Sequence, residues 1–560
     1  MTKEKKARSL LRDDSWIVGV CVFIGMLVLI GLAAWLGDLN QDEGWYLYAG
    51  RLVAEGQVPF RDFASTQGPV MSYVYALAYP LVRIGGLFAG RLFTALLGLA
   101  AVAVTMRLAA RQAGPRRTVA VRAAVLAAAF IGLNLYHVYF VTIVKTYALA
   151  GLLVMLALWA LDSGWQGLGT EVAGVASKAK GSWRVGILGL LGGGLLALAA
   201  GTRLSAGVLL PVWWLTLAGC AWKERRLGES SVLLLGFLMG GVLGIGLVFG
   251  PFVLLAPDGV QFGLLTYHAS RSPAGPFQMG AYKAGFFLRW FQAYFPLFVA
   301  GLISWLLPVR SEAAVDGEQK HESSSVGWLV GTGLGSVTLV HVMAAFPYDD
   351  YQVFAMPMAA VWVGARLARA LENMPARAPR LTFALLLLLL AGSLASPLLQ
   401  DWVLAERDRI WWPLRTESPV RQLQLAAQRL RENPSAGNRS LLLTQDIYLA
   451  VESGLRVPAG WELGPFSYFP DLSESAAQRY RVMNRARLLQ TLQESDAAWA
   501  AISGYGFAIA APLITPVPPA EVALFESVVQ SRFQVFLALE GFGQAATTMR
   551  LYERRAEDAE

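Results

Sequence analysis

The sequence predicts a multi-span α-helical membrane protein that carries a C-terminal extracytoplasmic α/β domain. Three observations lead to this prediction: a high apolar content, a series of long uncharged runs whose connecting loops alternate in charge, and a change of composition near residue 400. Of the 560 residues, 55% are hydrophobic and only 15% are charged, a composition that ordinary soluble domains do not have. The chain is therefore predicted to be an integral membrane protein.

The first membrane span is predicted between Trp16 and Trp35. This segment contains no charged residue and has a Trp at each end. About 20 apolar residues are needed to cross the hydrocarbon core, and Trp prefers the two interfaces. The basic segment before it, MTKEKKARSLLRDD, has no small-residue cleavage site, so a retained helix is expected rather than a cleaved signal peptide.

Further apolar runs predict the remaining spans. They cover residues 88–106, 119–139, 146–161, 185–200, 205–222, 231–255, 285–307, 326–345, 353–371 and 381–398. With the first run they make about eleven spans. Lys and Arg gather at the N-terminus and in every second loop, at residues 3–12, 107–122, 178–184, 223–226, 310–320 and 366–380.

The charge pattern also predicts orientation. Basic loops stay in the cytoplasm, so the N-terminus is expected to be cytoplasmic in a multi-pass protein of the cell (plasma or inner) membrane. An odd number of spans places the end of the chain outside. We expect a membrane domain at residues 1–400 and an extracytoplasmic domain at 401–560. The net charge of +8 comes from these loops and gives no indication of nucleic acid as a partner.

The first outer loop, GDLNQDEGWYLYAGRLVAEGQVPFRDF, places Asp42 and Glu43 just beyond the first span. The next segment is apolar but is interrupted by Pro69 and Pro80. If it crossed the membrane, every later loop would invert and the basic clusters would lie outside. We therefore predict that it lies as a helix in the outer interface, together with GWYLYAGRLVAEG before it.

The sequence of the tail predicts alternating helices and strands. SPVRQLQLAAQRLREN is predicted to be an amphipathic helix with Ser418 as N-cap and Pro419 at its first position. SESAAQRYRVMNRARLLQTLQES is predicted to be a second long helix, and SLLLTQD, FQVFLALE and TTMRLYER are predicted strands. There is no GxGxxG turn, P-loop, HExxH or GxSxG motif, and Cys21 and Cys220 form no ligand spacing or disulfide framework.

The membrane region resembles the GT-C glycosyltransferases. The resemblance lies in the first span, the loop that opens with Asp-Glu, two membrane-parallel helices and then GRLFTALLGLAAVAVTMRLAAR. The nearest branch is the protein mannosyltransferase-like group, which includes the bacterial aminoarabinose transferase of lipid A. It implies a GT-C fold and sugar transfer from a polyprenyl-phosphate donor to a lipid, glycan or protein acceptor on the outer face. It also implies that Asp42 acts as general base or orients the acceptor.

The chain departs from these relatives in two places. The aminoarabinose enzyme has a Glu-Lys-Pro stretch in its first loop, where the Lys meets donor phosphate. Here the comparable stretch is Thr66-Gln67-Gly68-Pro69. Several relatives carry an acidic residue in the second outer loop, where this chain has Lys145. Other basic residues must then hold the phosphate.

The expected chemistry needs a carboxylate to take the acceptor proton and fixed cations to stabilise the departing phosphate. Asp42 and Glu43 are the catalytic candidates, with Asp42 as general base and Glu43 in support. The alternative is that both carboxylates cap the interfacial helix, and the two roles are compatible. A single displacement would invert the anomeric carbon.

Lys145, Arg203 and Arg271 are the candidates for binding the donor phosphate. Lys145 and Arg203 lie in outer turns between apolar spans, where a charge is costly and is usually functional or paired. The alternative for each is that the side chain reaches the phosphates of membrane lipids. Arg271, in GLLTYHASRSPAGPF, offers a planar fork for phosphate.

His268 and Tyr351 are the candidates for substrate binding, with an ordinary loop residue and a solvated turn as their alternatives. Asp349 and Asp350 precede Tyr351 but lack supporting ligand spacing, so no metal site is assigned. No cofactor is predicted, and the sequence leaves a divalent metal open.

Two rival functions remain. A transporter or flippase of a lipid-linked sugar would also need outer cations, but the chain shows no matching halves with broken spans and no acidic relay. A catalytically silent relative could use its tail to organise partners. The sequence names neither the sugar nor the acceptor nor the polyprenyl length.

Overall fold

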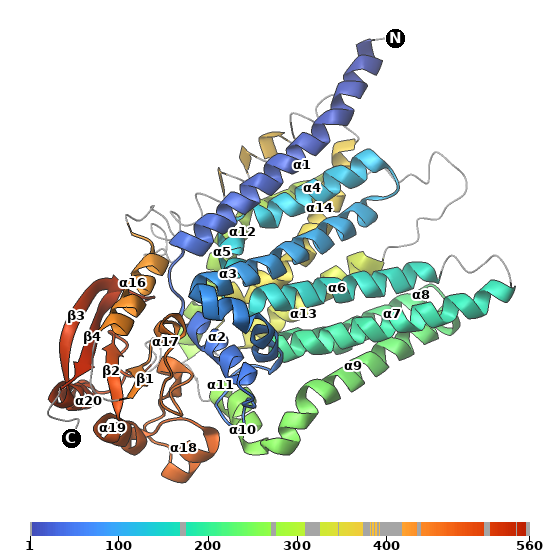
Figure 1. Cartoon of the computed structure of the whole chain (residues 1–560). Coiled ribbons are helices and arrows are strands. Elements are labelled where there is room, and N and C mark those ends of the chain that lie inside the picture. The colour runs from blue at the N-terminus through green and yellow to red at the C-terminus, as the bar shows by residue number, and fades with distance from the viewer. Residues whose placement is uncertain are drawn as a thin grey trace.

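The computed structural model describes residues 3–168, 175–269, 276–307, 325–344, 347–372, parts of 381–392, 417–433, 438–508, 516–544 and 546–555. It consists of a bundle of long helices and a smaller domain with a β-sheet at one end of the bundle (Figure 1). The last predicted span, at 381–398, falls largely outside the described residues.

The bundle contains the long helices of the described residues together with the short helix α5. They are α1 (Lys3–Leu36), α3 (Val70–Ala113), α4 (Arg117–Gly132), α5 (Leu135–Thr142), α6 (Thr146–Gly167), α7 (Val175–Thr202), α8 (Leu209–Lys223), α9 (Leu227–Leu255), α12 (Pro276–Leu306), α13 (Ser325–Met343) and α14 (Met356–Glu372). Within the described residues, nine helices are long and apolar enough to cross a membrane, or ten if α4 and α5, bent by 72°, count as one span. The predicted multi-span membrane protein is confirmed.

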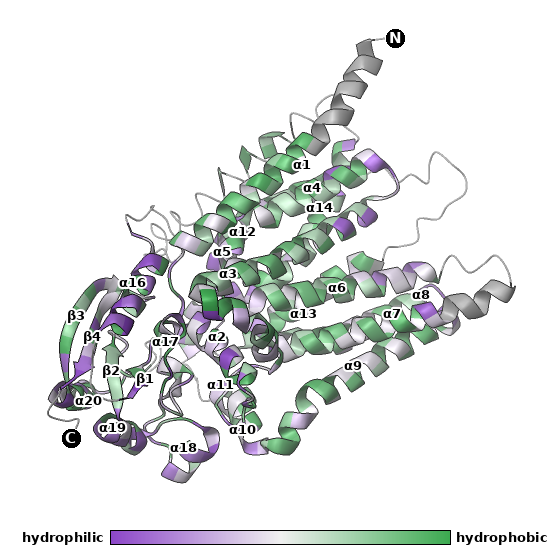
Figure 2. Cartoon of the chain, in the orientation of Figure 1, coloured by the Kyte–Doolittle hydropathy of each residue, from purple (hydrophilic) through white to green (hydrophobic). Residues whose placement is uncertain are grey.

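The long helices present apolar side chains outward. In Figure 2 they are mostly green, whereas purple residues gather on the tail helices and at the ends of the bundle. Leu247, Leu254 and Leu302 are 76%, 85% and 58% exposed. A continuous apolar exterior of this kind is unfavourable in water and suits a lipid environment.

Helix α3 is two helices joined at a kink. Gly86 adopts φ 57° and ψ −146° within it, a conformation that favours glycine. The carboxylate of Glu452, from the tail, accepts a hydrogen bond of 2.8 Å from the N–H of Leu87 just after the kink. Before the kink, Leu77 and Ile84 are 83% and 85% exposed. Residues 70–85 thus form a separate apolar helix, as expected for the predicted interfacial segment.

Helix α2 (Gln41–Ala54) begins with a capping box. The side chain of Asn40 accepts a hydrogen bond of 3.1 Å from the N–H of Asp42, and Glu43 Oε1 accepts one of 3.0 Å from the N–H of Asn40. Two N–H groups that a helix start leaves without partners are thereby satisfied. The cap fixes where α2 starts and so fixes the position of Asp42.

The tail is an α/β domain, as predicted. It contains α16 (Pro419–Glu432), β1 (Asn438–Thr444), α17 (Ile447–Ser453), α18 (Glu474–Tyr480), α19 (Arg485–Glu494), β2 (Ala497–Ile502), α20 (Pro519–Arg532), β3 (Phe533–Phe542) and β4 (Thr547–Arg554). The sheet order is β1-β2-β4-β3, with β1 and β2 parallel and the other pairs antiparallel. Ser418 caps α16 by accepting from the N–H of Arg421 at 3.3 Å.

Two tail predictions need correction. The single long helix predicted from Ser473 onward is two helices, because Arg481 adopts a left-handed conformation (φ 59°) that ends α18, and Asn484 then caps α19. Strand β2 was not predicted. Its sequence, AAWAAI, is alanine-rich and gives no strand signal, but β1 and β4 flank it and bury it.

The tail packs directly on the first loop. Residues of α2 and α3, such as Leu47 and Tyr75, belong to the same hydrophobic core as Leu442 and Phe525 of the tail. A Cβ on Gly44 of α2 would lie 2.3 Å from the backbone nitrogen of Tyr448 in α17. The glycine therefore allows the two helices to approach with no side chain between them.

Two carboxyl groups are buried in the tail. Asp446 is 1% exposed and Glu462 is 8% exposed. Burial raises the pKa of Asp446 to about 6, although hydrogen bonds from Tyr448, Ser503 and Gln41 oppose the rise. Burial also raises the pKa of Glu462 to about 7. Both groups therefore bind a proton more readily in the folded state than in the unfolded state.

We expect the protein to lose stability as the pH rises from 4.5 to 8. A carboxyl group with a raised pKa stabilises the fold when protonated, and this contribution disappears as the pH passes its folded pKa. Each group contributes on the order of 3 kcal/mol across the whole window. The measurement is the thermal midpoint of unfolding as a function of pH, for the wild type and for the double variant Asp446→Asn/Glu462→Gln. The midpoint of the double variant should change less with pH. Equal slopes would contradict the assignment.

Candidate active site

Four segments meet at the end of the bundle that carries the tail (Figure 1). Asp42 lies in the first turn of α2, and Lys145 directly precedes α6. Arg203 lies between α7 and the short helix η2 (Leu204–Val208). The short helix η5 (Asp349–Ala355) carries Asp350 and Tyr351. Each residue lies at or near the start or end of a helix.

Lys145 joins two carboxylates. Its Nζ lies 3.2 Å from Asp42 Oδ2 and 2.8 Å from Asp350 Oδ2, and the hydroxyl of Tyr147 donates to the same oxygen of Asp350 at 2.8 Å. Burial alone would lower the pKa of Lys145, but Asp350, Tyr147 and Asp42 raise it well above its usual value. The ammonium group therefore stays charged.

Asp42 is the most accessible carboxylate of this cluster. Its side chain is 27% exposed, against 12% for Asp350. Oδ1 of Asp42 accepts a hydrogen bond of 3.3 Å from Trp45 Nε1, while Lys145 holds Oδ2. The carboxylate is thus fixed in orientation and still open to a small molecule, which a general base requires.

Arg203 is a buried cation with a hydrogen-bond donor that is not used within the described part of the chain. It is 8% exposed, and its guanidinium donates to Thr146 Oγ1 at 3.2 Å. The guanidinium carbon lies 4.8 Å and 4.4 Å from the ring centroids of Tyr147 and Tyr351. Its Nε has no hydrogen-bond partner in the described part of the chain. A buried cation held by aromatic rings, with a donor to spare, suits an anionic ligand.

Tyr46 completes the described surroundings on α2. It is 5% exposed. Burial and then the charge of Asp42 raise the pKa of Tyr46 well above its usual value, while Arg203 and Lys145 oppose the rise. Its hydroxyl therefore stays neutral. No pattern in the sequence singles out Tyr46 among the aromatic residues of this segment.

Glu43 faces away from the cluster. It is fully buried and pairs with Arg91 of α3, whose Nη2 lies 2.6 Å from Oε1 and whose Nε donates to Oε2 at 2.8 Å. Oε2 also accepts from the N–H of Val144 at 3.2 Å. Arg91 donates further to the backbone carbonyls of Ala34, Gly37 and Asp38 at the end of α1. The pair thus links the first turn of α2 to α3, to the end of α1 and to the backbone just before Lys145, and the supporting catalytic role of Glu43 stays a prediction.

Two predicted residues remain, His268 and Arg271. His268, in α11 (Tyr267–Ala269), has its Nε2 2.9 Å from the carbonyl oxygen of Thr66, within the loop stretch that replaces the relatives' Glu-Lys-Pro. Arg271 falls outside the described residues, and its role stays a prediction. The structure thus brings Asp42, Lys145, Arg203 and Tyr351 together.

Asp349 and Asp350 form separate contacts. Asp350 binds Lys145, whereas Asp349 accepts a hydrogen bond from the hydroxyl of Tyr136 and pairs with Arg289 at 3.2 Å. Sequence analysis singled out the two aspartates but did not assign them as counter-ions. In the described ranges, no group of three or more His, Cys, Asp or Glu side chains is arranged to hold a metal ion, and the expectation of no metal stays a prediction.

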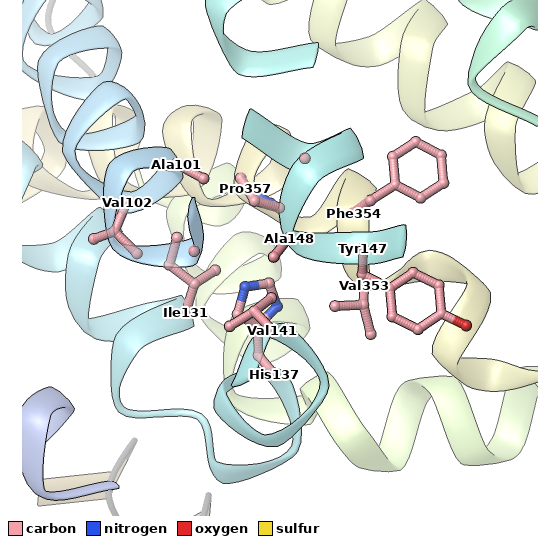
Figure 3. Close-up of a pocket in the computed structure, with 12 residues that line it drawn as sticks. Ala101, Val102, Ile131, His137, Val141, Tyr147, Ala148, Val353, Phe354 and Pro357 are labelled. Carbon is pink, nitrogen blue, oxygen red and sulfur yellow. The ribbon is translucent and has the colours of Figure 1, made fainter. Parts of the chain in front are cut away.

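A small apolar cavity lies behind Tyr147 (Figure 3). It is lined by Tyr147, Phe354, Val353 and His137, among others, and has a volume of about 10 Å³, which corresponds to about one water molecule. The Nδ1 atom of His137 forms a hydrogen bond of 3.0 Å with the hydroxyl of Tyr294. The cavity is too small for a sugar and does not form part of the candidate active site.

Solved structures match the fold. ArnT from Cupriavidus metallidurans bound to undecaprenyl phosphate has a TM-score of 0.57 and 15% identity, over 98% of this chain and 99% of that chain. Its apo form has a TM-score of 0.53 and 14% identity, over 97% and 99%. The oligosaccharyltransferase of Archaeoglobus fulgidus tethered to an acceptor peptide has a TM-score of 0.44 and 12% identity, over 99% and 75%. No protein-family model matches the chain, and no curated protein matches it by sequence.

The two ArnT structures establish a fold class. ArnT is a GT-C membrane protein, and the match runs through nearly the whole of both chains. This protein therefore has the GT-C fold that the resemblance of its membrane region implied, including the tail domain. At this level of identity the likeness concerns the fold, so residue roles depend on the geometry described above.

We expect Glu43→Gln to destabilise the protein by about 3–5 kcal/mol, because it leaves the charge of Arg91 buried and unpaired. The control is Arg61→Gln, which breaks a pair with Asp62 whose side chains are 46% and 29% exposed and should change stability little, because solvent and salt screen a surface pair. The measurement is the thermal midpoint of each purified variant. A Glu43 that acted on substrate would lower activity without lowering stability.

Proposed function

We propose that this protein is a glycosyltransferase that moves a sugar from a polyprenyl-phosphate donor to an acceptor on the outer face of the membrane, with Asp42 as general base. The observation that carries the proposal is the contact of a partly exposed Asp42 with Lys145, 3.2 Å away, beside the buried Arg203. A base and two cations at one end of a lipid-exposed bundle suit a reaction whose donor is a lipid phosphate.

In the proposed reaction, an acceptor hydroxyl attacks the anomeric carbon and transfers its proton to Asp42. The bond between the anomeric carbon and the phosphate oxygen breaks, and polyprenyl phosphate leaves with the bonding electrons. A single displacement of this kind inverts the anomeric carbon. Trp45 and Lys145 hold the carboxylate at 3.3 Å and 3.2 Å, so little reorganisation is needed before proton transfer.

Lys145 couples the two halves of this reaction. An ammonium group has three donors, and Asp42 and Asp350 account for two of them. The third can meet the donor phosphate together with Arg203. When Asp42 takes up the proton, it loses its charge, and the charge of Lys145 becomes available to the leaving phosphate.

The substrates are proposed by class. ArnT was crystallised with undecaprenyl phosphate, which supports a polyprenyl-phosphate donor here. Tyr351 stacks on Arg203, and His268 contacts the first loop, so both remain candidates for substrate binding, with Arg271 as a further phosphate ligand. The acceptor is a lipid, a glycan or a protein. The protein spans the cell membrane several times, with its N-terminus in the cytoplasm and its tail domain outside the cell membrane.

We expect Asp42→Asn to lower kcat by about 10²–10⁴-fold, because the amide cannot take the acceptor proton. The measurement is sugar transfer by the full chain in liposomes, with a panel of polyprenyl-phosphate sugars as donors. Asp471→Asn, an exposed carboxylate of the tail, is the matched control and should leave kcat unchanged. Equal turnover in wild type and Asp42→Asn would remove Asp42 from catalysis. Movement of the donor between leaflets without transfer would favour a flippase.

We expect Arg203→Gln to weaken binding of undecaprenyl phosphate by about 10- to 100-fold, since a charged hydrogen bond contributes about 1.5–3 kcal/mol. Arg203→Lys should fall in between, because Lys keeps the charge but loses the fork and the ring stacking. The control is Arg184→Gln, an exposed arginine in the first half of α7 and 19 positions before Arg203. Unchanged binding by Arg203→Gln would place the phosphate elsewhere.

A further inference from the structure

The tail contacts α2 at its first residue. The N–H of Gln41 donates to Gln544 Oε1 at 3.0 Å, and Gln41 Nε2 donates to Asp446 Oδ1 at 3.4 Å. Gln41 is 5% exposed and directly precedes Asp42. Two residues from distant parts of the tail therefore hold the residue next to the proposed base.

These contacts complete the start of the helix. The first N–H groups of a helix have no partner within it. In α2, the N–H groups of Asp42 and Glu43 bond to Asn40, at 3.1 Å each, whereas the N–H of Gln41 depends on Gln544 of the tail. The tail thus supplies one of the acceptors that the first turn of α2 needs.

Asp446 is built into the tail as a fixed acceptor. Its carboxylate accepts from the hydroxyl of Tyr448 and, at 2.8 Å, from that of Ser503, while its own N–H bonds to Thr444 Oγ1 at 3.1 Å. Tyr448, Ser503 and Gln41 face it, with Tyr505 beyond Tyr448, and all four are neutral. A buried carboxylate without a cation is costly, and hydrogen bonds alone determine its position.

We propose that Asp446 is a positioning residue for the transfer reaction: through Gln41 it fixes the first turn of α2 and so the placement of the Asp42 carboxylate. This inference rests on the proposed function. It assigns the tail domain a direct part in setting kcat. The backbone approach of Gly44 to Tyr448, one turn further along α2, makes this junction stiff, so a disturbance at Asp446 is transmitted to α2.

The position of Asp446 also predicts a pH dependence of the reaction. Because burial raises the pKa of Asp446 to about 6, the group gains a proton in mildly acidic solution and ceases to be an anionic acceptor for Gln41. The pH profile of kcat should therefore show an acidic step near this value. The step should be missing in Asp446→Asn, which has no proton to gain.

The test is a polarity swap between Gln41 and Asp446. Asp446→Asn removes the anionic acceptor, and Gln41→Glu places two carboxylates face to face. The double variant restores one hydrogen bond with donor and acceptor exchanged. Each single variant should lower kcat by about tenfold or more, because small misplacements of a catalytic group are costly. The KM for the donor should stay within about twofold, and the double variant should recover most of kcat.

Glu462→Gln is the matched control, since Glu462 is a buried carboxyl of the same domain that accepts from the N–H of Gly460. It should leave kcat unchanged. Wild-type kcat in Asp446→Asn, or a double variant no better than the worse single variant, would overturn the inference.

A second measurement separates this inference from the proposed function. If the wild type transfers no sugar from any donor, the proposed function fails, and hydrogen exchange in residues 38–48 tests the contact by itself. Faster exchange in Asp446→Asn, with recovery in the double variant and no change in Glu462→Gln, would support a tail that fixes α2. Equal exchange in all four proteins would overturn it.

Discussion

The buried ion pair between Glu43 and Arg91 is the contact on which the site depends. It joins the end of α1, the first turn of α2, the membrane half of α3 and the backbone just before Lys145. Both side chains are fully buried, and their remaining donors and acceptors bond to backbone groups. A buried pair is stabilising only when its geometry is this complete. This ion pair therefore helps to fix the positions of the neighbouring catalytic candidates, Asp42 and Lys145.

The second constraint is the balance of charge within the partly buried cluster of the candidate active site. Asp42 and Asp350 share Lys145, and Arg203 lies between aromatic rings. Asp350, which also accepts a hydrogen bond from Tyr147, lies 2.8 Å from the lysine, so Lys145 keeps one ion pair when Asp42 is neutral. A cation that stays in place while its neighbour gains a proton can serve a reaction in which charge moves from one oxygen to another.

The sequence predicted the fold class, the spans and the tail because these follow from hydropathy and loop charge, which are local properties. It also singled out Lys145 and Arg203, because charges are conspicuous in apolar surroundings, and it singled out Asp42 through the family resemblance of the first loop. It missed the partner of Glu43, although Arg91 stands in an apolar run where an arginine must be paired. It missed Asp350 as the counter-ion of Lys145 because the two are 205 residues apart. The break at Arg481 and strand β2 depend on tertiary contacts that periodicity does not contain.

The shared core of the tail and the first loop has a practical consequence for engineering. Apolar residues of α2 and α3 fill the same interior as those of the sheet, and Glu452 caps the kink of α3. The tail is therefore not a separable module, and cutting the chain after the last span would expose part of its interior to water. In chimaeras with related proteins, the exchangeable unit is the tail together with residues 37–87, although the two are far apart in the chain.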